Sequence, residues 1–511
     1  MIHAVELENF KGVCRRTRVE LAPVTLLFGA NNAGKSTILQ ALLYVSDIVN
    51  HGRADIDRTS LGGGSFDLGG FDRLVNGTEP FRSIGLRVEF DCGASLNCFR
   101  RDLDDFPLPN LDDELDRAWV DLTICRIGSP ARVVPGVQEL AIGTTASDEP
   151  LLRLCVERLD RAAEPLRIFL NVDHPLLAPA ADILRESTVP YMLGIGGPRD
   201  PLLFAMPYGF DASAVPDVRE PVRILDFGEH EDSAAPQAYR TLCTLIEMLS
   251  VGVLRQLASA LREMTYVGPL RAVPPRSLLS QRGEPTARWA DGLAAWTELL
   301  ADQWTLVDDT NRWLARVGAG CQVEVQQLAD PTADAEAPSF GESPAIVRRL
   351  QLAMVGSRAR GASRDGPMKL GKRVLPCEVG SGISQVVPVI VAALTAKHGR
   401  LALFEQPELH VHPALQVGLG DLFIESSVSR QLLIETHSEH IILRLLRRIR
   451  ETHDGDLPKD VPPFSAEKLS VLYVEQDDEG TSVRRLRVDA NGEFIDRWPH
   501  GFFEERTEEL F

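Results

Sequence analysis

Residues 29–37 have the residue types and spacing of a loop that binds phosphate. They read Gly-Ala-Asn-Asn-Ala-Gly-Lys-Ser-Thr, which satisfies the pattern G-x-x-x-x-G-K-[ST]. The glycines let backbone N–H groups turn toward phosphate oxygens, and the positive end of a following helix strengthens the attraction. Lys35 is expected to reach the β- and γ-phosphates of a nucleotide, and the Ser36 hydroxyl is expected to bind Mg²⁺. The predicted contacts in this loop are Asn31, Asn32, Gly34, Lys35, Ser36 and Thr37.

The sequence on either side of the loop supplies the strand and the helix that such a loop requires. Val24–Phe28 is an apolar, β-prone run, and residues 37–44 have apolar side chains three and four apart, which predicts a helix. A glycine-rich turn that matches the pattern by chance is the alternative, and the strand–loop–helix context disfavours it.

Two later apolar runs predict the other half of a nucleotide site. Leu401–Phe404 is followed directly by Glu405, an acid in the position that holds Mg²⁺ directly or through water. Leu432–Glu435 is a further core strand with His437 close behind it. Ligands of parallel α/β sheets bind at the carboxyl ends of strands, so these residues are site candidates. The alternative for His437 is an ordinary neighbour of a helix cap.

The rest of the chain predicts a mixed α/β protein. Strands are expected at Ile2–Glu8, Arg18–Phe28 and 84–90, and helices at 237–264, 289–304, 307–317 and 386–397. Because the nucleotide motifs are split, we expect a core built from residues 1–95 and 370–511, with 96–369 inserted. The strands Val24–Phe28, Leu401–Glu405 and Leu432–Glu435 should be neighbours in one sheet. Lys35 and Glu405 should then reach one Mg²⁺–phosphate group.

Composition limits the classes of partner. The chain has 511 residues and a net charge of −19, which argues against attraction of its whole surface to nucleic acid and leaves a local basic patch open. Eight cysteines without a C-x-x-C pair predict a reducing, cytoplasmic compartment. The sequence does not open on a signal-peptide pattern, and the apolar run 386–396 is too short to span a bilayer, so no membrane partner is expected.

The motifs together resemble a known group of proteins. The order GANNAGKST, EVGSGISQ, LALFEQPELHVHP and ETHSEH is similar to ATP-binding-cassette-type ATPases of the SMC, RecF and OLD group. More closely, it resembles a prokaryotic AAA-type family with a C-terminal domain of unknown function. The elements that carry this likeness are Tyr266–Arg271, Val379–Gln385, Glu405–Pro413 and Trp498–Phe503. Relatives of such ATPases, that of Septu among them, occur in bacterial anti-phage systems beside a nuclease or other effector.

The resemblance implies an α/β fold, a P-loop NTPase of ABC-ATPase-head type with a large α+β insertion. It implies ATP and Mg²⁺ as cofactors, a head-to-tail dimer that forms on ATP, Ser36 and Glu405 as metal ligands, and His437 as the switch histidine. The family's signature would lie at Ser381, Gly382, Ser384 and Gln385 and reach the partner's γ-phosphate. Either Ser381 or Ser384 could be the γ-phosphate ligand, because the alignment there is loose.

Gln406 departs from the pattern of most cassette ATPases, which have a glutamate there to polarise the attacking water. A glutamine can orient water but cannot accept its proton. Three interpretations follow: a natural E-Q-P-E motif in which Glu408 or a group of the partner chain is the base, very slow hydrolysis in an ATP-gated switch, or an engineered trap. The first is favoured because the string itself resembles the family.

Three hypotheses for the function remain. The first is an ATPase switch that senses nucleic acid or a phage signal and controls an effector protein. The second is an OLD-like nuclease, for which residues 473–478 give an acidic candidate, with a solvated hairpin as the alternative. The third is a non-hydrolysing ATP-gated scaffold. Arginines at 444, 447, 448 and 450 hint at nucleic-acid contact, although basic residues late in a helix also favour its dipole.

Overall fold

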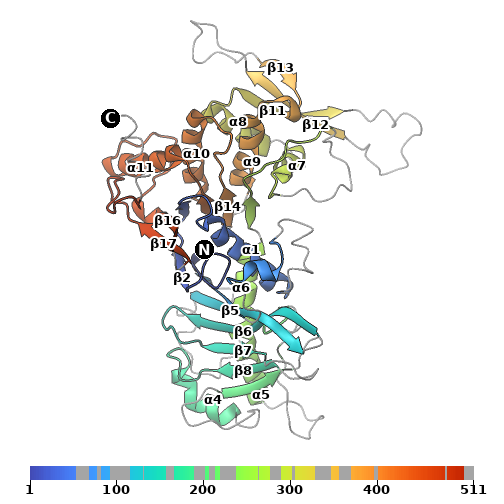
Figure 1. The fold of residues 1–511 in the computed structure, drawn as a ribbon, viewed down its shortest axis with the longest axis vertical. Coiled ribbons are helices and arrows are strands. Elements are labelled where there is room, and N and C mark those ends of the chain that lie inside the picture. Colours follow the sequence, from blue (N-terminus) through green and yellow to red (C-terminus); the bar gives the residue numbers. More distant parts are fainter. Residues whose placement is uncertain are drawn as a thin grey trace, which may run out of the picture. The chain divides into compact units, whose positions relative to one another are not determined.

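The structure is a computed structural model (Figure 1). It describes residues 1–52, 54, 68–77, 82–92, 116–129, 132–156, 166–188, 202–206, 213–218, 222, 237–262, 264–276, 289–301, 305–328, 347–355, 370–395, 401–477 and 480–499. These residues form two compact units, each described by itself. The first comprises Met1–Leu21, Ala30–Glu263 and Val474–Val483, and the second comprises Ala22–Gly29, Met264–Tyr473 and Arg484–Phe511.

The first unit is built on an antiparallel sheet of eight strands in the order β2-β1-β4-β5-β6-β7-β8-β9. The strands are β1 (Ile2–Glu8), β2 (Thr17–Glu20), β4 (Ile84–Asp91), β5 (Arg117–Ser129), β6 (Arg132–Thr144), β7 (Leu152–Cys155), β8 (Leu166–Leu170) and β9 (Leu202–Met206). Its helices are α1 (Lys35–His51), α2 (Phe71–Leu74), α4 (Ala181–Thr188), α5 (Gln237–Glu247) and α6 (Val253–Arg262), with 3-10 helix η4 (Ala178–Ala180).

The long helix predicted at 237–264 runs from α5 to α6 through a π-helical segment, η6 (Met248–Gly252). It packs on α1, where the Ser46 hydroxyl donates to the carbonyl of Leu261 at 3.3 Å. Among the described residues, Arg240–Arg262 is long and apolar enough to cross a membrane, and 72 % of its apolar window is buried inside the protein. Burial of this kind is typical of a core helix, which can be as long and as apolar as a membrane-spanning helix.

The second unit contains a sheet of six strands in the order β10-β14-β15-β3-β16-β17. Its strands are β10 (Thr265–Val267), β14 (Leu401–Glu405), β15 (Gln431–Glu435) and β3 (Val24–Phe28), followed by β16 (Leu469–Asp477) and β17 (Gly480–Leu486), both of which continue into the first unit. The pairings from β10 to β16 are all parallel. Every residue of β3, β14 and β15 is buried, as expected for parallel strands covered on both faces.

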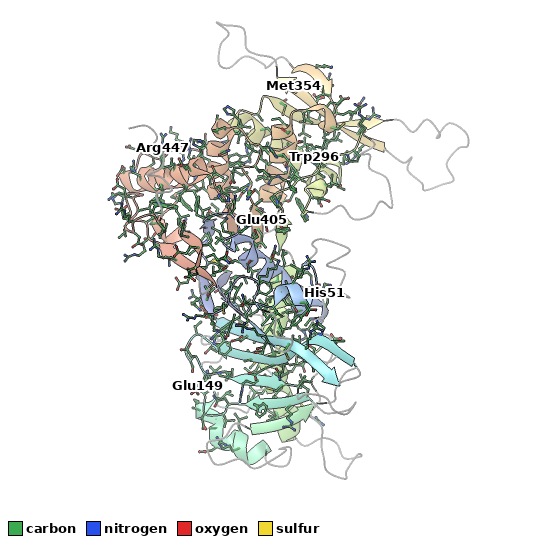
Figure 2. All side chains as sticks on the ribbon, in the orientation of Figure 1. His51, Glu149, Trp296, Met354, Glu405 and Arg447 are labelled. Atoms are coloured by element: carbon green, nitrogen blue, oxygen red, sulfur yellow. The ribbon has the colours of Figure 1, made fainter. Side chains whose placement is uncertain are left out.

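Helices and a smaller sheet complete the second unit. The helices are α7 (Leu293–Ala301), α8 (Thr305–Val317), α9 (Ser381–Thr395), α10 (Pro413–Ser426) and α11 (Glu439–Asp454), with 3-10 helices η7 (Pro376–Glu378) and η8 (Ala466–Lys468). The smaller sheet joins β11 (Cys321–Leu328), β12 (Val347–Val355) and β13 (Leu370–Val374) antiparallel. A core with Phe404, Phe423 and the fully buried Trp296 (labelled in Figure 2) packs these helices on the sheet.

The structure confirms one prediction and corrects others. The three predicted core strands are neighbours in one sheet, since β15 pairs with both β14 and β3. The strand predicted at Arg18–Phe28 is instead two strands in different sheets, because Pro23 lacks an N–H and interrupts the ladder. The helix predicted from residue 386 begins at Ser381, and the one predicted at 289–304 is α7, from Leu293 to Ala301.

The predicted division at residues 95 and 370 is based on the positions of the sequence motifs. The two compact units are defined by contacts between residues, so their boundaries differ from the predicted ones. The motif-based division stays a prediction. The W-P-x-G-F-F element is described only in part, because residues 500–511 lie outside the described residues. Its Trp498 ring packs edge-on against Phe28, the last residue of β3, with ring centroids 5.4 Å apart.

Candidate nucleotide site

The loop between β3 and α1 has the backbone of a phosphate cradle. Gly29, Asn32 and Gly34 have φ of 145°, 64° and 104°, a region that glycine and asparagine tolerate. Gly34 caps α1 without a side-chain hydrogen bond, so no cap side chain occupies the N–H groups of the first helical turn. Lys35 is 3 % exposed, and its Nζ donates to the carbonyl of Ala30 at 2.8 Å, which folds the ammonium group back over its own loop.

Within the first unit, Gly34 has a second reason to be glycine. A Cβ built on it would lie 2.7 Å from Oγ1 of Thr481, which belongs to β17. The main-chain N–H of Thr481 also donates to the carbonyl of Gly12 at 2.9 Å. The loop therefore lies against Thr481, a contact for which the sequence analysis had no signal.

Three strands of the second unit bring their functional residues to one edge. The phosphate loop leaves β3 after Phe28, β14 ends at Glu405, and β15 lies between them and ends at Glu435. With strands about 4.8 Å apart, β3 and β14 are separated by about 10 Å, a span that a nucleotide's phosphates and a metal ion can fill. Lys35 is part of the first unit, so its approach to Glu405 stays a prediction.

Glu405 lies at the end of β14 with 7 % of its surface exposed (labelled in Figure 2). The Tyr266 hydroxyl donates to its Oε1 at 3.0 Å. Burial, together with the negative charge of Glu405, raises the pKa of Tyr266, so the phenol stays a hydrogen-bond donor at neutral pH. A buried carboxylate oriented in this way is the hard oxygen ligand that Mg²⁺ prefers, and the residues present fit that ion.

Glu435 is a second carboxylate at this edge, to which the sequence analysis assigned no role. It is 5 % exposed and is the register partner of Glu405 on the neighbouring strand. Register partners on parallel strands point to the same face of the sheet. The available signal was that both acids end buried strands of five residues, at equivalent positions.

Gln406 begins the turn after β14 in a strained conformation. Its φ is +43°, which is uncommon for any residue but glycine, and its N–H donates to the carbonyl of Glu435 at 2.8 Å. The strand ends β14 and β15 are therefore tied together at the position where most cassette ATPases have their catalytic glutamate.

Glu408 bridges the same two strand ends. Its Oε1 accepts from the main-chain N–H of His437 at 2.7 Å, and its Oε2 accepts from the Thr436 hydroxyl at 2.8 Å. Burial raises its pKa, partly offset by these bonds. The two oxygens thus hold Thr436 and the backbone of His437, and the role of Glu408 as a base stays a prediction. His437 itself is partly buried and precedes Ser438, whose hydroxyl caps α11.

The signature residues divide by burial. Ser381 begins α9 and is exposed, and Gly382 is partly exposed. Ser384 is 0 % exposed and its hydroxyl donates to the carbonyl of Ser381 at 2.9 Å, while Gln385 is 6 % exposed. Ser384 and Gln385 are buried within this chain, and their contact with a partner's phosphate stays a prediction. Of the two serines left open, burial favours Ser381.

The arginines of α11 make contacts within the protein. Arg448 forms an ion pair with Asp421 of α10 at 2.8 Å and with Glu451, and Arg447 pairs with Glu451 at 2.7 Å. Arg444 lies 3.8 Å from Asp421, and Arg450 donates to the carbonyl of Asn491. These contacts weaken the hint of nucleic-acid binding. In the part of the chain that the structure describes, no group of three or more His, Cys, Asp or Glu side chains is placed to hold a metal ion. The acidic candidate for a nuclease at residues 473–478 stays a prediction, and residue 478 lies outside the described residues.

A parallel α/β sheet that carries a phosphate loop, an acid at a neighbouring strand end and a signature helix defines a P-loop NTPase of ABC-ATPase-head type. Family models agree. Residues 1–67 match an AAA ATPase domain, and residues 306–443 match a family described as AAA domain, putative AbiEii toxin, Type IV TA system. Residues 465–511 match a family described as protein of unknown function (DUF3696). These matches support a P-loop ATPase of AAA/ABC type, and such families use a nucleotide, typically with Mg²⁺.

Solved structures of SMC heads align along most of the chain at low similarity. The SmcHead bound to the C-winged helix domain of ScpA is 11% identical to this chain. The alignment covers 95% of this chain and 97% of the SmcHead chain, with a TM-score of 0.37. The SMC head domain from Thermotoga maritima is 9% identical, with 95% and 99% covered and a TM-score of 0.37. The Smc head domain with an extended coiled coil, bound to the C-terminal domain of ScpA derived from Pyrococcus furiosus, is 11% identical, with 95% and 96% covered and a TM-score of 0.38. The search of the curated proteins gave no match.

Proposed function

We propose that this protein is an ATPase that hydrolyses ATP slowly, dimerises head to tail on ATP and acts as a switch for a partner effector. The observation that carries the proposal is the single sheet edge at which the phosphate loop leaves β3, Glu405 ends β14, and Glu435 ends β15 with His437 two residues beyond it. Such an edge is where parallel α/β proteins bind nucleotides.

The proposed roles follow from the chemistry of each group. Lys35 and the N–H groups of the loop bind the phosphates, and Ser36 and Glu405 hold Mg²⁺, which neutralises the charge that develops on the phosphoryl group. Gln406 orients the attacking water without taking its proton, which predicts slow turnover. His437, held by Glu408, lies at the strand end where it can sense the γ-phosphate.

The proposed dimer follows from the exposed start of α9. A γ-phosphate carries charge that hydroxyl and N–H groups of two chains can share, and Ser381 with Gly382 offers such groups at a helix N-terminus. ADP lacks the γ-phosphate and should therefore leave the protein monomeric.

The proposed setting is prokaryotic anti-phage defence in the cytoplasm, with an effector encoded nearby. The occurrence of relatives of such ATPases in anti-phage systems, Septu among them, supports it, as does the match of residues 306–443 to a family whose description names a toxin–antitoxin system. A non-hydrolysing scaffold is the second candidate, because Gln406 cannot serve as a general base.

Light scattering and phosphate release, measured together, test the proposal. The wild type should double its mass with ATP and Mg²⁺, remain monomeric with ADP, and release phosphate slowly. The Lys35→Ala variant should neither dimerise on ATP nor release phosphate. A mass that is indifferent to nucleotide would overturn the switch, and dimerisation without phosphate release would establish the scaffold instead.

A further inference from the structure

Arg271 is a buried arginine whose contacts join two motifs of the site. It is 4 % exposed, and its Nε donates to Oε1 of Gln385 in α9 at 3.1 Å. Gln385 donates in return from Nε2 to the carbonyl of Arg271 at 2.6 Å. The Nη2 of Arg271 donates to the carbonyl of Gln406 at 3.1 Å and to the carbonyl of Leu409 at 3.5 Å. All of these groups belong to the second unit.

The turn that Arg271 contacts needs support from outside. Gln406 and His410 both have positive φ, +43° and +62°, a left-handed conformation that costs free energy in residues other than glycine. Arg271 binds the carbonyl of Gln406 and that of Leu409, the residue before His410. A guanidinium presents several donors in a fixed fork, so Nε can bond Gln385 while Nη2 bonds the two carbonyls, an arrangement that the rotatable ammonium group of a lysine does not fix.

The start of α9 touches the same turn at a second place. A Cβ built on Gly382 would lie 3.1 Å from the carbonyl oxygen of His410. The signature residues and the turn are therefore in close contact both through Gly382 and through the pair Gln385–Arg271. Contacts therefore run without a gap from the start of α9 through Arg271 to the backbone of Gln406.

The hydrogen bonding of Arg271 is not that of an arginine that serves only to fill the core. Its Nη1 has no hydrogen-bond partner among the described residues. A buried donor of this kind costs free energy and calls for an explanation. Burial lowers the pKa of Arg271 to about 10, against the opposing charge of Glu408, so the group remains a cation at neutral pH.

We propose that Arg271 is a positioning residue that sets the backbone of the turn 406–410 and, through Gln385, couples it to the signature end of α9. The inference rests on the proposed ATPase function and deepens it, since it names the contact by which engagement of the signature reaches the residue that orients water. The phosphate loop takes no part in this coupling, so nucleotide affinity should be independent of it.

The test compares Arg271→Lys and Gln385→Met with Arg430→Lys as a matched control. Arg430 is 7 % exposed and donates to the carbonyls of Ala392 and Leu394, at the other end of α9. Steady-state ATP hydrolysis is measured below the melting temperature of each variant, per site that binds nucleotide, so that unfolded protein does not count. If Arg271→Lys does not fold, Gln385→Met still tests the contact, because it keeps the volume and charge of the site.

Arg271→Lys and Gln385→Met should each lower kcat about tenfold or more and leave KM for ATP within about threefold. The double variant should be no slower than the slower single variant by more than about twofold, because both changes break one coupling. Arg430→Lys should lower the melting temperature but keep kcat within about twofold of the wild type. The ATP-dependent increase in mass should persist in all of them.

Other results overturn the inference. If Arg271→Lys and Gln385→Met keep the kcat of Arg430→Lys, or if their effects multiply in the double variant, the coupling does not exist. Loss of the ATP-dependent increase in mass would place the two residues at the dimer interface instead of behind the turn. If the wild type itself releases no phosphate, the proposed hydrolysis fails and the positioning role fails with it, a result distinct from the others.

Discussion

The carboxylate of Glu408 accepts a hydrogen bond of 2.7 Å from the main-chain N–H of His437, across the ends of two parallel strands. The Thr436 hydroxyl donates to its other oxygen at 2.8 Å. An acid three residues beyond the metal-binding position thus fixes the residue expected to sense the γ-phosphate. The contact accounts for a second glutamate in E-Q-P-E without requiring that it touch water.

Glu408→Gln should change how stability depends on pH. Burial raises the pKa of Glu408 above its ordinary 4.5. The stability due to the protonated acid is then fully present below pH 4.5 and is lost as pH rises through the raised pKa, because the unfolded chain ionises first. As the pH rises through this window, the wild type loses this stability and Glu408→Gln does not. The free energy of unfolding of Glu408→Gln, relative to that of the wild type, should therefore increase with pH. Urea titrations at a series of pH values check this, and a pH-independent difference would contradict it.

Lys35→Ala should abolish stabilisation by nucleotide. A ligand at roughly a hundred times its Kd adds about 2.7 kcal/mol to the folded state, which is enough to shift a melting curve clearly. The wild type should melt higher with ATP and Mg²⁺, and Lys35→Ala should not. Lys468→Ala is the control, because this lysine is exposed and donates to the carbonyl of Pro463 at the surface. An unchanged melt of the wild type with excess ATP would count against the site.

Gln406→Glu should raise turnover and shorten the lifetime of the ATP-bound dimer. A positioned general base contributes about 10²-fold or more, of which the strained turn should allow at least about tenfold. Phosphate release and the decay of the dimer after dilution measure both effects. Unchanged or lower turnover would mean that another group positions the water, and Glu435, the register partner of Glu405, would be the next residue to replace.

Ser381→Ala should weaken ATP-driven dimerisation more than Ser384→Ala. Ser381 is exposed at the start of α9, whereas Ser384 is wholly buried and bonded to the carbonyl of Ser381. Loss of a hydrogen bond to a charged group costs about 1.5–3 kcal/mol, roughly a tenfold to hundredfold weaker dimer. Sedimentation with ATP at several protein concentrations gives the dissociation constants. The opposite order would favour Ser384 as the phosphate ligand.

Arg448→Ala should destabilise the protein far more than Arg447→Ala. The Arg448 side chain is 7% exposed and pairs with Asp421 and Glu451, so its loss leaves a partly buried acid uncompensated, at about 2–4 kcal/mol. The Arg447 side chain is 64% exposed, and its pair with Glu451 is worth about 0.5 kcal/mol. Denaturant unfolding separates the two variants. Equal stability of both, with loss of DNA binding, would return α11 to the nucleic-acid hypothesis.

The sequence by itself determined the parts of the site that depend on neighbours in the chain. The phosphate loop needs nine consecutive residues and the strand and helix on either side of them, all of which the local pattern specifies. Uninterrupted apolar runs also identified β3, β14 and β15 and placed Glu405 at a strand end. Their adjacency in one sheet was predicted correctly, because parallel strands buried on both faces have few other places to pack.

Only the tertiary structure decided which distant residues meet at that edge. Tyr266 and Glu405 are 139 residues apart, and Arg271 and Gln385 are 114 apart, so no local periodicity relates them. The register that sets Glu435 beside Glu405 depends on how β14 and β15 slide together. The burial of Ser384 depends on where α9 begins and on what packs against it. Contacts of this kind are set by the simultaneous packing of several elements, which a linear pattern does not contain.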